Sequence, residues 1–311
     1  MYAKLHLVFL TVLASIGFII FDSKTFAQSN IKPDNTLGTE SSQVITNFRG
    51  LQVEAITGGA VREINLFHSF QEFNISDGRG AYFFVPNANI QNVLARVTGN
   101  NRSEILGILG TFGASEPNLY LMNPNGIIFG KNAQLNLGSS FVATTANAMQ
   151  FPGGGEFSAS SPLAPNNSLL SVNPTAFLFN QIANQGANSI ENHGRLGAIN
   201  NKSIILLGGN IAPTPESTGK ILIDGGFIFS EGGRVEVGGL NTPGIVGINI
   251  NANELGLSFP NHITKTDISI VNNSRIAAVN GADVAINAND FNLHNSGIGL
   301  FTSNAPGSLI G

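Results

Sequence analysis

Two carboxylates near the C-terminal end of this 311-residue chain have a spacing that could support sugar chemistry. Asp267 begins the segment DISIVNNS, and Asp290 begins the similar segment DFNLHNSG, 23 residues later. If 23 residues form one turn of a repetitive fold, the two acids stack closely enough for glycoside cleavage. An Asp that starts a turn also accepts hydrogen bonds from nearby backbone amides. We favour this structural interpretation, because no basic residue recurs beside the two acids.

Other groups that could do chemistry are scattered along the sequence. His6 lies at the N-terminus, and His193 and His294 lie at repeat turns. His262 has no second ligand at metal spacing, and we assign His68 to an edge or cap position. The chain has neither the G-x-S-x-G of a serine nucleophile nor a glycine loop followed by Lys and Ser or Thr. We expect no enzyme, no metal site and no cofactor.

The elements that position these residues are short strands. GKILIDG, GGRVEVGG and GADVAINA each alternate in polarity and are bracketed by Gly or Ala, a pattern typical of a sandwich, a barrel or a parallel β-solenoid. The 23-residue repeat, and the likeness of IENHGRLGAI to IVNNSRIAAV, favour the solenoid, in which each coil stacks on the next. Asn is about as common as Gly, which occurs 37 times. Both residues suit coil corners, where stacked Asn side chains can form ladders.

The segment NLYLMNPNGIIFG has two apolar runs joined by Asn123, Pro124, Asn125 and Gly126, and the second run begins at Ile127. Asn-Pro-Asn-Gly is the signature of a type I turn, so we predict a coil corner here. The segment NPTAFLF repeats the pattern 50 residues later, about two coils on, and predicts a second corner at Asn173 and Pro174.

Three segments allow more than one interpretation. NVLARVTG fits a strand or a two-turn helix, and we favour the strand because SEILGIL after it alternates. FHSFQEF stays ambiguous, since its apolar residues are three apart. The stretch PGGGEFSASSPLAPNNS, Pro152 to Ser168, is predicted to be a loop or a boundary that projects from the stack.

The N-terminus is predicted to be a signal peptide. Lys4 lies in a short basic start, Leu7 to Phe21 is apolar, and small residues end at Ala27, so the mature chain should begin at Gln28. The alternative, a membrane anchor, needs about 20 apolar residues and has only about 15 here. An exported chain with a net charge of −4 is a poor ligand for nucleic acid. The absence of Cys leaves stability to packing and hydrogen bonds.

The segments that follow the signal resemble a known family. IKPDNTLGTESSQV, LFHSFQEFNISDGRGAYF, NVLARVTGNNRSEILGIL and NLYLMNPNGIIFG together are similar to the N-terminal secretion domain of filamentous haemagglutinin-type exoproteins. The Asn-Pro-Asn-Gly-Ile element at 123–127 is the most specific mark. A second family motif, Asn-Pro-Asn-Leu, is missing, and its neighbourhood has VPNANI at Val85 to Ile90.

The resemblance implies a right-handed parallel β-helix with an N-terminal cap and a role in two-partner secretion. It implies a partner, an outer-membrane β-barrel transporter with periplasmic docking domains, which recognises the domain and passes the chain outward in extended form. We divide the chain into a signal peptide at 1–27, a secretion domain at 28–150 and a β-helix continuation at 151–311. We expect a secreted or cell-surface adhesin, or a fragment of one, with host or cell-surface glycans as further ligands. The alternative is a polysaccharide lyase or hydrolase, since enzymes share this fold.

Overall fold

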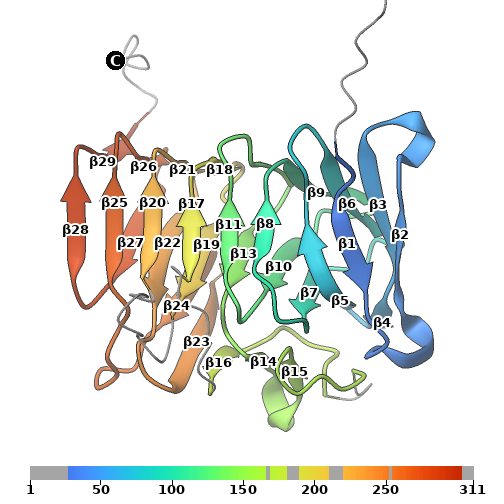
Figure 1. Ribbon diagram of the computed structural model, residues 1–311. Coiled ribbons are helices and arrows are strands. Elements are labelled where there is room, and N and C mark those ends of the chain that lie inside the picture. The colour runs from blue at the N-terminus through green and yellow to red at the C-terminus, as the bar shows by residue number, and fades with distance from the viewer. Residues whose placement is uncertain (1–26, 166–168, 181–188, 210–219, 252–253, 303–311) are drawn as a thin grey trace, which may run out of the picture.

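The structure is a computed structural model of the chain and describes residues 27–165, 169–180, 189–209, 220–251 and 254–302. Strands of successive turns pair in parallel, so the chain winds into a parallel β-helix, as the repeat predicts (Figure 1). Its only other regular elements in the described residues are the short 3-10 turns η1 (Gly38–Glu40), η2 (Phe48–Gly50) and η3 (Pro152–Gly154). The described part contains no helix with the length and apolar character of a membrane span.

Three sheets, which we call A, B and C, form the sides of the helix. Sheet A contains β1 (Asn30–Pro33), β4 (Ala60–Arg62), β5 (Asn65–Asn74), β7 (Asn92–Val97), β10 (Asn118–Met122), β13 (Phe141–Thr144), β19 (Ile204–Gly208), β22 (Arg234–Gly239) and β27 (Asp283–Asn287). Sheet C contains β8 (Ser103–Ile105), β11 (Ile127–Phe129), β17 (Ile190–Asn192), β20 (Ile221–Asp224), β25 (Ile268–Val271) and β28 (Phe291–His294). Sheet B contains β2 (Ser42–Ile45), β3 (Val53–Gly58), β6 (Gly80–Val85), β9 (Ile108–Gly113), β12 (Gln134–Asn136), β18 (Arg195–Ala198), β21 (Phe227–Glu231), β26 (Arg275–Val279) and β29 (Gly297–Phe301).

From β7 onward, each coil passes from a strand of sheet A to one of sheet C and then to one of sheet B, as β10, β11 and β12 do. The coil length near the C-terminal end is the one that the repeat predicts, because Ile268 pairs with Phe291, 23 residues later. The first coils are slightly longer, and Val93 pairs with Leu119. Sheet A continues without a break from β13 to β19, across residue 150.

Asparagines stack at the corner that leads into sheet A. Asn65, Asn92 and Asn118 begin β5, β7 and β10 and lie side by side in the register of the sheet. Asn92 Nδ2 donates to Asn65 Oδ1 at 2.9 Å, and Asn118 Nδ2 donates to Asn92 Oδ1 at 3.1 Å. Asn118 Oδ1 accepts a hydrogen bond from Ser139 Oγ. The predicted Asn ladder is therefore present, and it satisfies amides that the corner buries.

An apolar core fills the inside of the coils along the whole stack. Phe70, Phe73 and Phe83 form its N-terminal end, where the rings of Phe73 and Phe83 stack with their centroids 5.8 Å apart. Burial of each such ring stabilises the fold by roughly 1.5–3 kcal/mol. Val93 and Ile190 continue the core from coil to coil. This repeated inward packing holds the helix together without a disulfide.

A fourth, antiparallel sheet, D, lies outside the coils (Figure 1). It contains β14 (Ala148–Gln150), β15 (Glu156–Ser158), β16 (Ala176–Phe179), β23 (Gly244–Asn251) and β24 (Glu254–Ser258). Phe157 and Phe177 of this sheet pack with Phe67, Tyr120 and Ile205 of sheet A in a second buried core. The central strands β10, β13 and β19 are thus covered on both faces, which explains why they are mostly apolar and almost fully buried.

The structure resolves the ambiguous segments. NVLARV forms β7, so the strand interpretation is confirmed, and FHSFQEF lies inside the ten-residue strand β5. The prediction for Pro152 to Ser168 holds in part over its described residues: the segment lies outside the coils and is mostly irregular, but it is not only a loop. The described part contains η3 and β15, and Phe157 is only 1% exposed against sheet A. Its single buried aromatic ring outweighs the Gly, Pro and Ser that surround it.

The N-terminal end of the inner core is closed by β1 and β2, which run antiparallel to β5 and β3. A buried ion pair between Glu54 and Arg79 lies beneath this cap. Ser29 Oγ donates to Glu54 Oε2 at 2.9 Å, and Arg79 Nε donates to Glu54 Oε1 at 2.7 Å. Arg79 Nη2 also donates to Asn47 Oδ1. Both carboxylate oxygens are bonded, which compensates the burial of the charge.

Candidate functional site: the Asn123–Ile127 corner

The predicted turn joins β10 to β11, and so forms the corner between sheets A and C. Gly126 N donates to Asn123 O at 3.1 Å, which closes a four-residue turn. Asn125 does not have a positive φ, which agrees with a type I turn, whereas Gly126 has φ +113°. A Cβ atom at Gly126 would lie 3.1 Å from Ser189 O and 3.2 Å from Arg102 Nε. Both backbone conformation and space therefore favour glycine.

Asn123 joins three consecutive coils. Its side chain is fully buried, and Nδ2 donates to Asn101 O and to Ser103 Oγ, both at 3.0 Å. Oδ1 accepts the backbone N–H of Asn125 at 3.0 Å, so the same amide also braces the turn. The backbone N–H of Asn123 donates to Thr144 O in the next coil. These bonds can form together only when the neighbouring coils are in place.

The folded corner leaves little of the motif accessible. Asn123, Gly126 and Ile127 are buried, whereas Pro124 and Asn125 are partly exposed. Asn125 Nδ2 donates to Gly99 O at 2.7 Å, so this amide also belongs to the hydrogen bonds between coils. A protein that contacts the folded domain here reaches only the Pro ring and part of one amide.

Charged side chains flank the corner on sheet C. Arg102 Nη2 lies 2.8 Å from Glu191 Oε1, and Glu191 Oε2 lies 3.4 Å from His193 Nε2. His193 Nδ1 lies 2.9 Å from the backbone oxygen of Asp224. Within the described residues, no His, Asp and Glu side chains form a group that could hold a metal ion. The chain of pairs links neighbouring coils across the outer face of sheet C.

The second Asn-Pro pair does not turn a corner of the helix, so that prediction is wrong. Asn173 and Pro174 lead into β16, which pairs antiparallel with β14 and β23 in sheet D. Asn173 Oδ1 accepts a hydrogen bond from Asn92 Nδ2 at 2.8 Å, which attaches this segment to the Asn ladder. This segment shares Asn-Pro with 123–126 but has Thr175 and Ala176 in place of Asn-Gly, and the strand that follows pairs outside the coils.

The segment from Val85 to Ile90, where the second family motif is missing, forms the corner between β6 and β7. Ile90 N donates to Asn87 O at 3.4 Å, and Asn89 N donates to Asn87 Oδ1 at 3.0 Å. Asn87 therefore braces this turn through its side chain, as Asn123 does in its own. Unlike Asn123, it is exposed.

Of the two candidate acids, Asp267 has the structural role that we favoured, whereas the Asp290 carboxylate contacts only the side-chain amide of Asn289 in the bonds described, at 3.4 Å. Asp267 and Asp290 lie at equivalent positions of consecutive coils, directly before the paired residues Ile268 and Phe291. Asp267 Oδ1 accepts the backbone N–H of Asp290 at 3.1 Å. Asn289 Nδ2 also points to Asp267 Oδ1, at 3.4 Å. The carboxylate of one coil thus supports the turn of the next.

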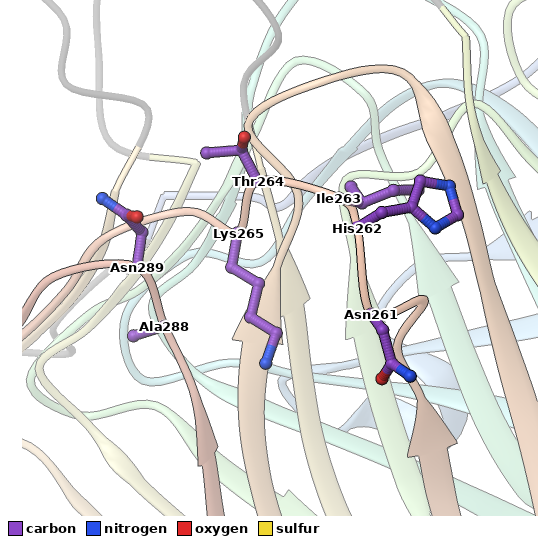
Figure 2. A pocket seen from close by; sticks show the side chains of 7 residues that line it. All are labelled: Asn261, His262, Ile263, Thr264, Lys265, Ala288 and Asn289. Atoms are coloured by element: carbon purple, nitrogen blue, oxygen red, sulfur yellow. The ribbon is translucent and has the colours of Figure 1, made fainter.

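A polar hollow lies beside these turns (Figure 2). It has a volume of about 330 Å³ and is lined by Asn261, His262, Ile263, Thr264, Lys265, Ala288 and Asn289. In Figure 2 the His262 ring and the Lys265 ammonium group point in different directions. Lys265 Nζ instead lies 5.5 Å from the centroid of the Phe259 ring. No acid and base converge at this hollow.

His68 is buried beneath the cap, in keeping with the predicted cap position. Its Nδ1 lies 3.0 Å from Ser42 Oγ of β2, and its ring packs beside Phe83 with centroids 5.1 Å apart. Burial lowers the pKa of His68 to about 3, so the imidazole is neutral in the folded protein. His294 lies on β28, where Ser296 Oγ donates to its backbone oxygen.

Sequence reasoning missed a polar cluster around Arg96 of β7. Arg96 Nε donates to Ser69 Oγ at 2.9 Å, and Nη2 donates to Thr36 Oγ1 at 2.8 Å. Nη1 and Nη2 also donate to the backbone oxygens of Ser158 and Leu163, at 2.8 and 2.9 Å. One guanidinium group therefore fastens the N-terminal segment and the β15 segment to sheet A. The signal in the sequence is a lone Arg in the apolar strand NVLARV.

The acidic member of this cluster is Asp34. Burial raises the pKa of Asp34. Hydrogen bonds from Thr36, Thr98 and Ser69 together lower it by more, so the net pKa lies below the usual value. Burial also lowers the pKa of Arg96 to about 10, against the attraction of Asp34. At neutral pH both groups are charged, and hydroxyl groups connect them.

A capped parallel β-helix with an extra sheet on one side and a buried Asn-Pro-Asn-Gly corner defines a class of β-solenoid. The model of the TPS secretion domain family matches residues 29–293, and the chain therefore belongs to this family of two-partner secretion exoproteins. None of the curated proteins matches the chain.

Among solved structures, the secretion domain of HMW1 from Haemophilus influenzae has a similar fold. The TM-score is 0.51 at 18% sequence identity, and the match covers 88% of this chain. The chain spans about two thirds of that structure, 66% of its length. At this identity the likeness supports the β-helical fold alone. Conclusions about function rest on the family match and on the site.

Proposed function

We propose that a dedicated outer-membrane β-barrel transporter with periplasmic docking domains exports this chain, and that residues 28–150 direct the export. The observation that carries the proposal is the burial of the Asn123–Ile127 corner. Three of its five residues are inaccessible in the folded domain, so a partner that reads the whole motif must meet it before the coils close. An extended segment can bind by adding a strand to a sheet edge, with affinity from main-chain hydrogen bonds.

Folding then withdraws the motif from the partner. The hydrogen bonds of Asn123 to Asn101, Ser103 and Thr144 form as neighbouring coils stack. Each coil that closes outside the cell makes the return of the chain less favourable, because coils are added one at a time to their neighbours. After export we propose a non-catalytic adhesin at the cell surface. The non-catalytic part of this proposal is supported by Asp267, whose carboxylate accepts a hydrogen bond from the turn of the next coil.

Replacing Asn125 and Gly126 by Ala should reduce export more than it reduces stability. Loss of the hydrogen bond to Gly99 O and a forced positive φ at position 126 should destabilise the domain by roughly 1–3 kcal/mol. Export is measured as extracellular yield in cells that carry the transporter, and stability as the melting temperature of refolded domain. We expect native-like circular dichroism, with the chain retained in the periplasm.

The matched control replaces Asn280 and Gly281 by Ala. Both residues of this pair have positive φ, at +56° and +85°, whereas only Gly126 does in the motif, and the pair turns the corner between β26 and β27. Its export should fall only as far as its melting temperature predicts. If both double variants follow one relation between export and melting temperature, the Asn123–Ile127 corner is a structural turn and not a recognition element.

The mature secreted protein should begin at Gln28. Residues 1–26, with the predicted signal, lie outside the described residues, whereas Ala27 and Gln28 are exposed. Small residues before an accessible bond are what a signal peptidase requires. N-terminal sequencing of protein from the culture medium tests this. Recovery of a membrane-bound chain that still carries Met1 would contradict it.

A further inference from the structure

The outer face of sheet B carries aromatic rings that lie outside the Asn123–Ile127 corner. Side chains alternate along each strand, so Tyr82 and Phe84 face outward on β6 while Phe83 lies in the inner core. The parallel register places further aromatic residues on the same face. The outward aromatic residues of sheet B, all partly or well exposed, are Tyr82, Phe84, Phe112, Phe227, Phe229 and Phe301.

Two of these rings rest on glycines of the neighbouring strand. The register sets Tyr82 beside Gly110 and Phe229 beside Gly197. A Cβ atom at Gly110 would lie 2.6 Å from the Tyr82 ring, and one at Gly80 would lie 2.7 Å from it. At Gly197 the overlap with the Phe229 ring would be still greater. The rings therefore lie flat on the sheet, where any larger residue would lift them.

Arginines flank the aromatic pair on β21. Arg195 and Arg275 are the register partners of Phe227 on its two sides. The guanidinium carbon of Arg195 lies 4.9 Å from the centroid of Phe227 and 6.0 Å from that of Phe229. Phe227 and Phe229 themselves stack with centroids 5.5 Å apart. Arg195 and Arg275 therefore place two cationic groups beside Phe227. The exposed carboxylate on the same side of β21, Glu231, lies two residues beyond Phe229 and accepts a hydrogen bond from Asn280 Nδ2.

Polar side chains fill the space between the two aromatic positions. Gln134 and Asn136 face outward on β12 and are exposed, and Asn136 Nδ2 donates to Tyr82 Oη at 3.2 Å. Strands β6 and β21 are four places apart in the sheet, so Tyr82 and Phe229 are separated by about 19 Å at the usual strand spacing. A ligand that touches both rings must be extended and must alternate flat apolar surfaces with polar groups.

We propose that this face binds an acidic polysaccharide, a chain of uronate sugars that lies along the helix axis from Tyr82 to Phe229. The flat apolar side of a sugar ring can stack on an exposed aromatic face, and its hydroxyl groups can bond to Gln134 and Asn136. Sugar carboxylates would meet Arg195 and Arg275, since guanidinium groups pair well with carboxylates. A protein partner would instead need pockets for its anchoring side chains, and rings that lie flat on a sheet offer none.

Binding of polygalacturonate to the refolded mature chain tests the proposal by affinity electrophoresis and calorimetry. The fully methyl-esterified polymer, which has the same sugar without the charge, should bind at least about fivefold more weakly. Phe229→Ala should weaken binding of polygalacturonate about tenfold, as loss of a central aromatic contact does. Arg195→Gln should weaken it without affecting the ester. The control Arg102→Gln removes the same charge from sheet C and should leave both affinities unchanged.

Several results would overturn the proposal. The first is the absence of any binding of polygalacturonate, and the second is equal affinity for the acid and the ester. The third is an equal loss of affinity in Arg195→Gln and Arg102→Gln, which would indicate general charge attraction. Hydrogen exchange distinguishes a protein site: protection of β6 and β21 by the periplasmic domains of the transporter, without protection by polygalacturonate, would assign the face to export. If Phe229→Ala does not fold, the proposal is tested instead by the affinity of Tyr82→Ala for polygalacturonate. The ratio of the unaltered chain's affinities for the acid and the ester provides a second test. Because refolded protein is used, failure of export does not affect the result.

Discussion

Replacing Arg96 by methionine should lower the free energy of unfolding of the mature chain by about 3–5 kcal/mol, because a buried, multiply bonded charge is lost. Methionine retains an apolar stem against Phe157, whose ring centroid lies 4.3 Å from the guanidinium carbon. The change leaves two backbone oxygens, of Ser158 and Leu163, without these donors. It also leaves the Asp34 carboxylate without its nearby cation.

Urea unfolding followed by circular dichroism measures this loss, and Arg102→Met is the matched control. Arg102 pairs with Glu191, and both side chains are nearly one-fifth exposed, so that variant should lose no more than about 1 kcal/mol. Hydrogen exchange should also increase first in β15 and its flanking residues, which Arg96 attaches to sheet A. A loss below 1 kcal/mol in Arg96→Met would show that the cluster adds little to the packing of Phe157.

The second large effect should appear in the dependence of stability on pH. The pKa of His68 falls from an ordinary 6.5 to about 3 in the folded state, so between these values the unfolded chain binds more protons. Stability must then decrease as the pH falls below about 6.5. From pH 7 to pH 5 this one group should destabilise the fold by about 2 kcal/mol.

Denaturant titrations at pH 7, 6 and 5 check this expectation, with His68→Gln as the variant that cannot titrate. The slope between pH 7 and 5 should be much smaller in the variant. Asp34 does not interfere, because its pKa lies below the usual carboxyl value and its contribution is lost only below about pH 4. Equal slopes in both proteins would mean that His68 is protonated without unfolding.

The helix could be predicted from sequence because its information is local and repeated. The similarity of the Asp267 and Asp290 segments sets the coil length, and Ile268 and Phe291 are paired as that spacing requires. The corner at Asn123 is also encoded locally, since Pro, Asn and Gly each suit one position of the turn. Its burial could not be predicted, because the partners of Asn123 come from the preceding and following coils.

Sheet D could not be predicted, because its pairing depends on tertiary contacts. Phe177 of β16 pairs with Val246 of β23, which is far along the chain, and the Asn-Pro pair at Asn173 also begins the turn of a helix corner at Asn123. The Arg96 cluster depends on the same contacts. A lone Arg in an apolar strand indicates a buried charge, but its acceptors on Ser158 and Leu163 exist only once sheet D covers sheet A.

Sheet D also affects how this architecture can diversify. Both of its insertions leave the helix at one corner, between a strand of sheet A and the next strand of sheet C, at residues 145–189 and 240–267. At the same corner of an earlier coil only Asn123 to Gly126 are present, yet Ile127, Ile190 and Ile221 remain in register across sheet C. The register of sheet C therefore does not depend on the length of the segment inserted at this corner, so a coil can carry a long covering segment or a four-residue turn.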